Sequence, residues 1–259
     1  MTALLRVIGI GKDFAGLAAL DDLSFELEAG SALGVLGPNG CGRTLLIDMI
    51  SGLRPPDRGQ IILGGEADLA RLPAQDIHER GIARNWQDLQ LLGGISVLDE
   101  VMLGGFSRRN SSLLAAAFGL PAARGDIAEA LSRAAQMVEL VGLADRAASL
   151  AERLTRYEQM RVGIARALTS QPDILLLDAP AAGLTDGELA DLGGLIAVLR
   201  EAGISVLVAD RSMKLIAQCC DRAIALDAGR MIALGTPAEC FAAAAVQRAY
   251  FGVAGADEC

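Results

Sequence analysis

Lysine, histidine and aromatic residues are scarce in this sequence, and it contains no long uncharged apolar run. Only two of the 23 lysine and arginine residues are lysines, Lys12 and Lys214, so arginine is the usual cation of the chain. No stretch of about 18 uncharged apolar residues occurs, which argues against a bilayer-spanning helix. The N-terminal residues lack the basic region, apolar stretch and cleavage site of a signal peptide, so a cytoplasmic location is expected.

The chain also lacks the charge and the cysteine spacing of several protein classes. A net charge of −9 argues against a general nucleic-acid binder, which needs a positive footprint. The five cysteines show no C-x-x-C spacing and have no histidine partners, since the single histidine, His78, falls in the ordinary stretch A-Q-D-I-H-E-R-G. We therefore expect small buried side chains rather than disulfides or zinc ligands.

What the sequence does contain is an alternation of strand and helix patterns over 259 residues, enough for a sizeable core. Residues 4–28 predict two strands, and the apolar runs at 173–180 and 204–210 are typical of strands buried on both faces. The pattern predicts an α/β fold with a mainly parallel sheet and an inserted helical part between Gln87 and Arg161. The other predicted elements are a strand at 31–37, helices at 41–53, 186–202 and 237–251, and a hairpin at 222–237.

The segment Gly37 to Thr44 reads G-P-N-G-C-G-R-T and differs at one position from a phosphate-binding loop. The pattern requires G-x-x-x-x-G-Lys-Ser/Thr, and Arg43 stands where the lysine should be. A strand precedes the loop and a helix follows it, which is the context that such a loop needs. Its N–H groups and the positive end of the helix would bind an anion, and Thr44 would offer a hydroxyl to Mg²⁺.

Asp178 ends the buried run I-L-L-L-D and fits the carboxylate that holds Mg²⁺ through water beside such a loop. An ordinary strand-end aspartate and a chance glycine-rich turn are the plain alternatives. The presence of both features in one chain favours a nucleotide site.

These residues and several further segments resemble the ATP-binding subunit of ABC transporters, in particular the LivG-type subunit of branched-chain amino acid importers. The segments include R-L-T-R-Y-E-Q-M in the signature region, L-L-L-D-A-P-A-A-G-L after it, V-L-V-A-D-R-S-M-K-L-I in the switch region and the ending A-V-Q-R-A-Y-F-G. The resemblance implies ATP and Mg²⁺, with Phe14 stacking on adenine and Gln87 sensing Mg²⁺ and the permease. The implied nucleotide-binding residues are Phe14, Gly37, Asn39, Gly40, Gly42, Arg43, Thr44, Leu45, Gln87 and Thr155. The implied metal-binding residues are Thr44, Gln87 and Asp178.

The resemblance also implies a division of the chain and a set of partners. Residues 1–87 and 162–235 would form a nucleotide-binding core with an N-terminal antiparallel β subdomain. Residues 88–161 would form a helical subdomain with the signature, and residues 236–259 a C-terminal helix and tail. The implied partners are a second ATPase subunit, LivF-like or a copy of this chain, and membrane permease subunits. The implied place is the inner face of the cell membrane, as a peripheral protein.

Several positions depart from the family pattern, and all of them concern the chemistry. Arg43 replaces the loop lysine, Ala179 the glutamate that activates the attacking water, and Arg211 the switch histidine. General-base catalysis is typically worth about 10²–10⁴-fold in rate. In the signature, Tyr157 replaces a glycine, and we expect its ring to occupy the space through which backbone approaches phosphate. Glu158 adds a negative charge there.

Two functions follow from this pattern. The first is a hydrolysis-impaired subunit, structural or regulatory, that binds nucleotide weakly or not at all, docks on a permease and leaves turnover to a partner. The alternative is an active ATP-hydrolysing subunit that drives amino-acid import. A P-loop protein of DNA repair is disfavoured, because the chain lacks the long coiled-coil insert and the basic surface that it would need.

Overall fold

The structure, a computed structural model, describes residues 3–65, 67–86, 91–105 and 121–252. The chain divides into two compact units: Met1–Ile82 with Leu176–Cys259, and Ala83–Leu175. The second unit is wider than the helical subdomain expected at residues 88–161, because it also contains the whole of α6 (Arg156–Leu168).

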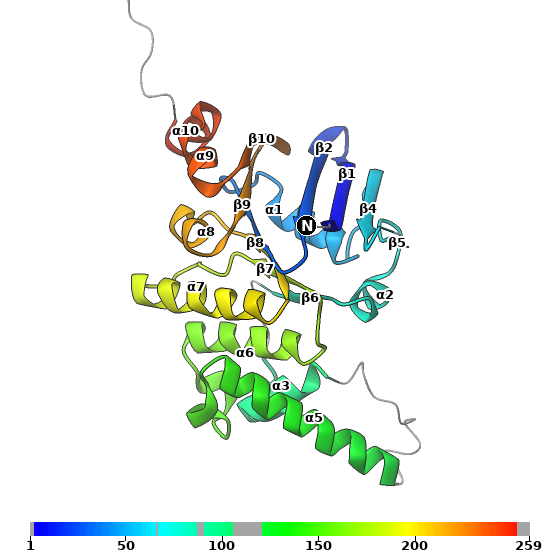
Figure 1. The fold of residues 1–259 in the computed structure, drawn as a ribbon, viewed down its shortest axis with the longest axis vertical. Helices are drawn as coiled ribbons and strands as arrows, with labels where there is room; N and C mark the ends of the chain where they lie inside the picture. Colours follow the sequence, from blue (N-terminus) through cyan, green and yellow to red (C-terminus); the bar gives the residue numbers. More distant parts are fainter. Residues whose placement is uncertain (1–2, 66, 87–90, 106–120, 253–259) are drawn as a thin grey trace, which may run out of the picture. The chain divides into compact units, whose positions relative to one another are not determined.

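The N-terminal sheet has four strands in the order β2-β1-β4-β5, and its neighbouring strands run antiparallel (Figure 1). This confirms the expected antiparallel β subdomain. Its strands are β1 (Ala3–Phe14), β2 (Leu17–Glu28), β4 (Arg58–Leu63) and β5 (Ala67–Asp68).

The second sheet has six strands in the order β10-β9-β3-β8-β7-β6. Strand β3 pairs in parallel with β8 and with β9, whereas β9 and β10 form the predicted hairpin. Every residue of β3, β7 and β8 is buried, as expected of strands covered on both faces. The strands are β3 (Ala32–Leu36), β6 (Ile82–Asn85), β7 (Ile174–Asp178), β8 (Ser205–Ala209), β9 (Arg222–Asp227) and β10 (Arg230–Gly235).

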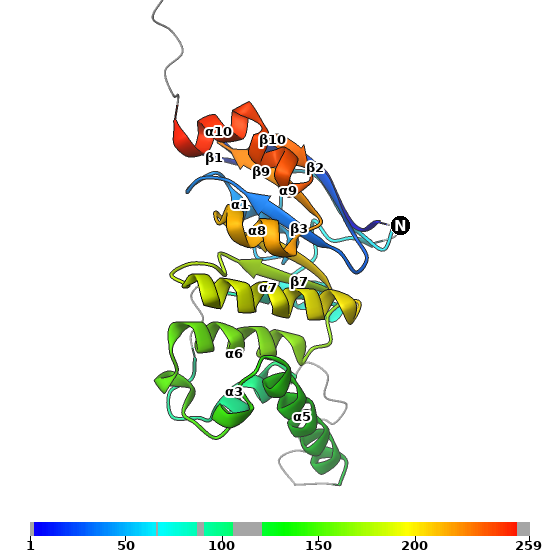
Figure 2. The same cartoon turned by 60° about the vertical axis from the view of Figure 1, so that its left-hand side comes forward.

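In the first unit, α7 and α8 pack on each other, with α7 also against β8 and α8 against β3 (Figure 2). The single C-terminal helix predicted for residues 237–251 is wrong, because the extended backbone of Ala243 (φ −64°, ψ 126°) divides it into α9 and α10. The helices are α1 (Arg43–Ile50), α2 (Ala74–Glu79), α7 (Asp186–Glu201), α8 (Met213–Cys219), α9 (Pro237–Ala242) and α10 (Ala244–Phe251).

The second unit contains α3 (Val97–Leu103), α5 (Pro121–Leu140) and α6, and each of these helices packs on the other two. Glu100 on α3 is fully buried and forms an ion pair with Arg166 on α6, at 2.7 Å. The other oxygen of Glu100 accepts a hydrogen bond from the N–H of Leu92, so the carboxylate also fixes the segment before α3. Among the helices of the described residues, none is long and apolar enough to cross a membrane.

Helices α6, α7 and α9 begin with the same device, a threonine and a glutamate that cap each other's backbone N–H groups. At α7 the carboxylate of Glu188 accepts from the N–H of Thr185, and this hydrogen bond holds the pKa of Glu188 below its ordinary value of 4.5. A lowered folded-state pKa stabilises the protein above the ordinary pKa, and the contribution is lost as the pH falls through the lowered value.

We therefore expect Glu188→Gln to reduce the loss of melting temperature between pH 7 and pH 3, because the glutamine side chain still offers an oxygen acceptor to the Thr185 N–H but does not titrate. The matched control is Glu201→Gln at the other end of α7, where the exposed carboxylate makes no hydrogen bond among the described residues. Thermal unfolding at several pH values measures both. An identical acid dependence in the two variants would contradict the expectation.

Candidate functional site

The glycine-rich loop joins β3 to α1, and two of its glycines have backbone conformations that other residues rarely adopt. Gly40 has φ 81° and Gly42 has φ 106°. A Cβ atom on Gly42 would lie 2.6 Å from Leu20 Cδ2 and 3.2 Å from Ala19 O, so only glycine fits there. No side chain caps the N-terminus of α1, and its first turn has no acidic residue. The start of α1 is therefore available to an anion.

A cavity of about 470 Å³ lies beside this helix start. Its walls come from three segments of the first unit: the beginning of β2, the loop with the first turn of α1, and the turn between β9 and β10. They are Leu17, Ala18, Ala19, Gly40, Cys41, Gly42, Arg43, Thr44, Leu45 and Ala228.

The predicted residues Gly40, Gly42, Arg43, Thr44 and Leu45 thus line one cavity, whereas Gly37, Asn39 and Phe14 do not line it. The Phe14 ring lies at the end of β1, 43% exposed, with Lys12 Nζ and Arg54 Cζ each 6.0 Å from its centroid. Sequence reasoning missed the wall formed by Leu17 to Ala19. Leu17, at the start of β2, is 73% exposed.

Thr44 and Asp178, 134 positions apart in the chain, meet at the site. The Thr44 hydroxyl donates to Asp178 Oδ1 at 3.2 Å, and Asp178 is buried at the end of β7. A hydroxyl and a carboxylate are the oxygen ligands that Mg²⁺ accepts, usually together with water and phosphate oxygens. Within the described ranges no group of three or more His, Cys, Asp or Glu side chains gathers.

Arg43 bends back onto its own loop. Its Nη1 donates to the carbonyl oxygen of Gly37 at 2.6 Å. The N–H of the same glycine donates to the hydroxyl oxygen of Tyr250, on α10, at 2.8 Å. Tyr250 was not predicted as part of the site, since nothing in its neighbourhood in the sequence points to phosphate binding.

Comparison with known proteins agrees with this geometry. The family model described as ABC transporter matches residues 20–182. The chain belongs to the ABC transporter family. It is 36% identical to the high-affinity branched-chain amino acid transport ATP-binding protein LivG of Salmonella typhimurium, over 97% of this chain and 98% of LivG. It is 34% identical to the corresponding protein BraF of Pseudomonas aeruginosa, again over 97% and 98%.

Solved structures support the same assignment. The crystal structure of the ADP conformation of MJ1267, an ATP-binding cassette of an ABC transporter, matches with a TM-score of 0.84 at 25% identity. The match covers 98% of this chain and all of that one. The resemblance seen in the sequence is therefore confirmed, as is the fold that it implied.

The turn after Asp178 carries Ala179 at the position where the resemblance implies a glutamate. Ala179 has φ 48°, and its N–H donates to Ala209 O at 2.7 Å. Its side chain is a methyl group, which neither accepts nor donates a proton. The backbone of the turn is held by this hydrogen bond, but position 179 carries no carboxylate.

A carboxylate that the sequence did not single out lies nearby. Asp210, buried at the end of β8, accepts hydrogen bonds from the N–H of Ala181 at 2.7 Å and of Ser212 at 2.8 Å. It therefore ties the turn after β7 to the switch segment. Arg211 lies between Asp210 and Ser212 in the sequence. It is exposed and has no ion-pair partner among the residues that the structure describes.

In the signature region Tyr157 is buried, 8% exposed, and the Arg161 guanidinium lies 4.6 Å from the centroid of its ring. Its expected place beside phosphate stays a prediction. Thr155 is the N-cap of α6 and accepts from the N–H of Glu158. The Glu158 carboxylate accepts from Thr155 N–H and lies 3.4 Å from Arg146 Nε. These interactions hold its pKa low, with the Thr155 hydrogen bond as the largest cause.

Gln87 lies outside the described residues, so its predicted contact with Mg²⁺ stays a prediction. Of the cysteines, Cys41, Cys219 and Cys240 are buried and free, as expected, and Cys220 is partly exposed. Burial raises the pKa of Cys41, which keeps this thiol of the loop neutral.

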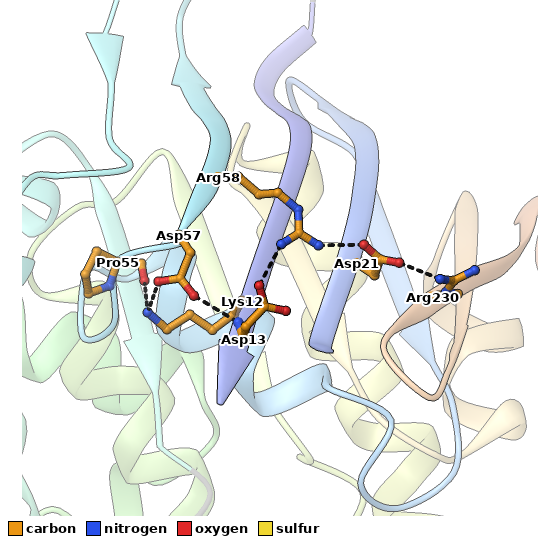
Figure 3. Close-up of polar contacts among 7 residues, drawn as sticks. All are labelled: Lys12, Asp13, Asp21, Pro55, Asp57, Arg58 and Arg230. Atoms are coloured by element: carbon orange, nitrogen blue, oxygen red, sulfur yellow. Dashed lines mark hydrogen bonds and ion pairs between the residues drawn. The ribbon is translucent and has the colours of Figure 1, made fainter. Parts of the chain in front are cut away.

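The turn between β9 and β10 supports the loop from outside. Gly229 N–H donates to Cys41 O at 3.2 Å, and Gly229 O accepts from Asp21 N–H at 2.9 Å. The Asp21 carboxylate lies between two arginines, Arg58 at 2.5 Å and Arg230 at 2.7 Å, as Figure 3 shows. The loop, the hairpin turn and the N-terminal sheet are thereby joined.

The same network continues to the end of β1. Arg58 also pairs with Asp13 at 3.0 Å, and Asp57 accepts from Asp13 N–H and from Lys12 Nζ (Figure 3). Each exposed ion pair of this kind contributes little to the free energy of folding. We therefore interpret the network as aligning β1, β2 and β4 with one another more than as stabilising the protein.

We expect Gly229→Ala to destabilise the loop. A Cβ atom there would lie 2.5 Å from Ala19 O, in addition to the strain of φ 80°. The matched control is Gly203→Ala, which has φ 88° but nothing within 4 Å of the new methyl group. Both variants should lose roughly 1 kcal/mol from the left-handed backbone, and Gly229→Ala about 1–3 kcal/mol more from the overlap. Chemical denaturation measures both, and equal losses would contradict the argument.

Proposed function

We propose that this chain is the ATP-binding subunit of an ABC importer of the branched-chain amino acid type, and that it binds nucleotide without hydrolysing it at a useful rate. Its role would then be structural or regulatory. The observation that carries the proposal is the identity of Ala179. It directly follows Asp178, the aspartate proposed to hold Mg²⁺, and its side chain is only a methyl group, although the backbone of the turn is held by a hydrogen bond to Ala209.

The expected loss of rate is large. General-base catalysis is typically worth about 10²–10⁴-fold, which corresponds to roughly 3–5 kcal/mol of barrier. Asp210 is the nearest candidate to replace the glutamate, but both of its oxygens already accept backbone N–H groups. Its carboxylate is committed to holding the turn after β7 and the switch segment together, which favours a positioning role over that of a base.

The two arginines support the same conclusion. Arg43 donates one hydrogen bond to Gly37 O. Arg211 is exposed and stands at the position where the resemblance implies the switch histidine. A guanidinium donates hydrogen bonds and stays charged, so neither side chain takes a proton from water. Because residues that act as one catalytic unit lose activity non-additively, the three substitutions together remove little more than Ala179 alone.

Nucleotide binding itself is supported by the backbone. The uncapped start of α1, the glycines with positive φ and the cavity fit a phosphate chain, and the Thr44–Asp178 pair fits Mg²⁺. A bound Mg²⁺ would neutralise phosphate charge. In this proposal Gly37 and Asn39 shape the loop from outside the cavity, Phe14 and Leu17 offer apolar surface to the base, and Gln87 approaches the metal.

The proposed partners are a second cassette, LivF-like or a copy of this chain, and permease subunits, with the assembly at the inner face of the cell membrane. Residues 1–87 and 162–235 would act as the nucleotide core and residues 88–161 as the helical part. Each composite site would take the signature from the other subunit. Thr155 is exposed at the start of α6 and could contact the nucleotide of a partner's site, whereas the ionised Glu158 carboxylate beside it would oppose a triphosphate.

The alternative is an active ATP-hydrolysing subunit, which the identity to LivG and BraF favours because both are named as ATP-binding proteins of transport. It requires water activation by a group other than a glutamate after Asp178.

The purified chain should therefore show no Mg-ATP turnover above background while still binding a fluorescent ATP analogue. The triple variant Arg43→Lys/Ala179→Glu/Arg211→His should gain turnover, because it restores the family's base and phosphate contacts. Its control is the same variant with Asp178→Asn, which should lose the gain. Turnover at ordinary rates by the unmodified chain, abolished by Asp178→Asn, would establish the active alternative instead.

The assembly is tested separately. We expect the chain to co-purify with the permease and ATPase subunits encoded beside it, with or without added ATP, since docking on a permease needs no hydrolysis. Ala179→Glu serves as the matched control, because it alters the site without altering the surface of the helical unit. Failure of both forms to retain any membrane subunit would contradict the proposed role.

A further inference from the structure

The C-terminal helix reaches the phosphate loop directly. Tyr250, in the last turn of α10, places its hydroxyl oxygen 2.8 Å from the N–H of Gly37, the first glycine of the loop. The two residues are 213 positions apart and belong to the same compact unit. The phenol therefore joins the end of the chain to the point where β3 becomes the loop.

Gly37 has almost no freedom to move away from this bond. A Cβ atom on it would lie 2.3 Å from Cys41 Sγ and 2.4 Å from Leu226 O, so its Cα is packed against the loop on one side and β9 on the other. Its carbonyl oxygen accepts from Arg43. Tyr250 and Arg43 thus hold the two polar groups of one residue.

The phenol is suited to this role across the physiological pH range. Burial raises the pKa of Tyr250 by more than the Gly37 hydrogen bond and the charge of Arg43 lower it. Tyr250 therefore stays neutral, and a neutral hydroxyl accepts one hydrogen bond without bringing a negative charge next to a phosphate site.

We propose that Tyr250 is a positioning residue of the nucleotide site, so that the affinity of the loop for nucleotide depends on α10. The inference rests on the proposed function for the identity of the ligand and goes beyond it in assigning the C-terminal helix to the site. Without the hydroxyl, the buried N–H of Gly37 would lose its acceptor, and the loop would rearrange to satisfy it. Nucleotide would then have to order the loop as it binds, which weakens binding.

The test compares Tyr250→Phe, which removes one oxygen atom, with Phe251→Leu. Phe251 is the next residue of the same helix, is 72% exposed and makes no hydrogen bond to the loop through its side chain. In the full chain without nucleotide, amide hydrogen exchange of peptides from residues 36–46 should become faster in Tyr250→Phe only. Peptides from β8 and α7 should exchange as before.

In a titration with a fluorescent ATP analogue, Tyr250→Phe should bind about 3- to 10-fold more weakly than the unmodified chain, the effect of one net hydrogen bond. Phe251→Leu should bind unchanged. The weakening should be the same at pH 6.5 and pH 8.5.

Unchanged exchange of the loop in Tyr250→Phe would overturn the inference, and so would faster exchange throughout the chain, which would show a merely structural role. Faster exchange of the loop with unchanged affinity would overturn it as well. If the unmodified chain binds no nucleotide, the proposed function fails, whereas the exchange comparison, made without nucleotide, still decides whether Tyr250 holds the loop.

Discussion

The hydrogen bonds to the main chain of residues 37–42 are the constraint on which the rest of the site depends. Gly37 is held by Tyr250 through its N–H and by Arg43 through its carbonyl, and Cys41 accepts from Gly229 of the β9–β10 turn. The three partners come from the end of the chain, from the loop itself and from a distant hairpin. Two of these bonds, from Tyr250 and from Gly229, do not involve the side chain at the lysine position, whereas the third is made by the Arg43 side chain itself. The shape of the loop in turn sets the direction of α1 and the walls of the cavity.

The turns that carry positions 179 and 211 are held by hydrogen bonds to backbone groups. The N–H of Ala179 donates to Ala209 O, and Asp210 accepts from the N–H groups of Ala181, in the turn after β7, and of Ser212, in the switch segment. None of these bonds involves the side chain at position 179 or 211. In the second unit, α6 begins with a complete capping box although two signature positions are changed. Substitutions at such positions cost activity and leave stability nearly untouched.

The sequence predicted the parts of this structure that local patterns encode. The buried apolar runs predicted β7 and β8, the glycine spacing predicted the loop, and the motifs assigned to one site Thr44 and Asp178, which form a hydrogen bond in the structure. What it missed depends on contacts between distant segments. Neither Tyr250 nor Asp210 lies in a motif that periodicity reveals, and both act through backbone groups far away in the chain. The contact of the Tyr157 ring with Arg161 was also not predicted, because the position of a signature residue says nothing of the cation that packs on its ring.

Binding and catalysis therefore rest on different parts of this cassette. Phosphate recognition by a helix start and glycine-rich backbone uses N–H groups that every residue except proline carries, so side-chain substitution does not remove it. Water activation uses one carboxylate at one position, and a single change abolishes it. Arg43 keeps a positive charge in the wall of the cavity, which favours anion binding and supplies no base. Under the proposed function, backbone recognition of phosphate therefore survives side-chain changes that would remove the base.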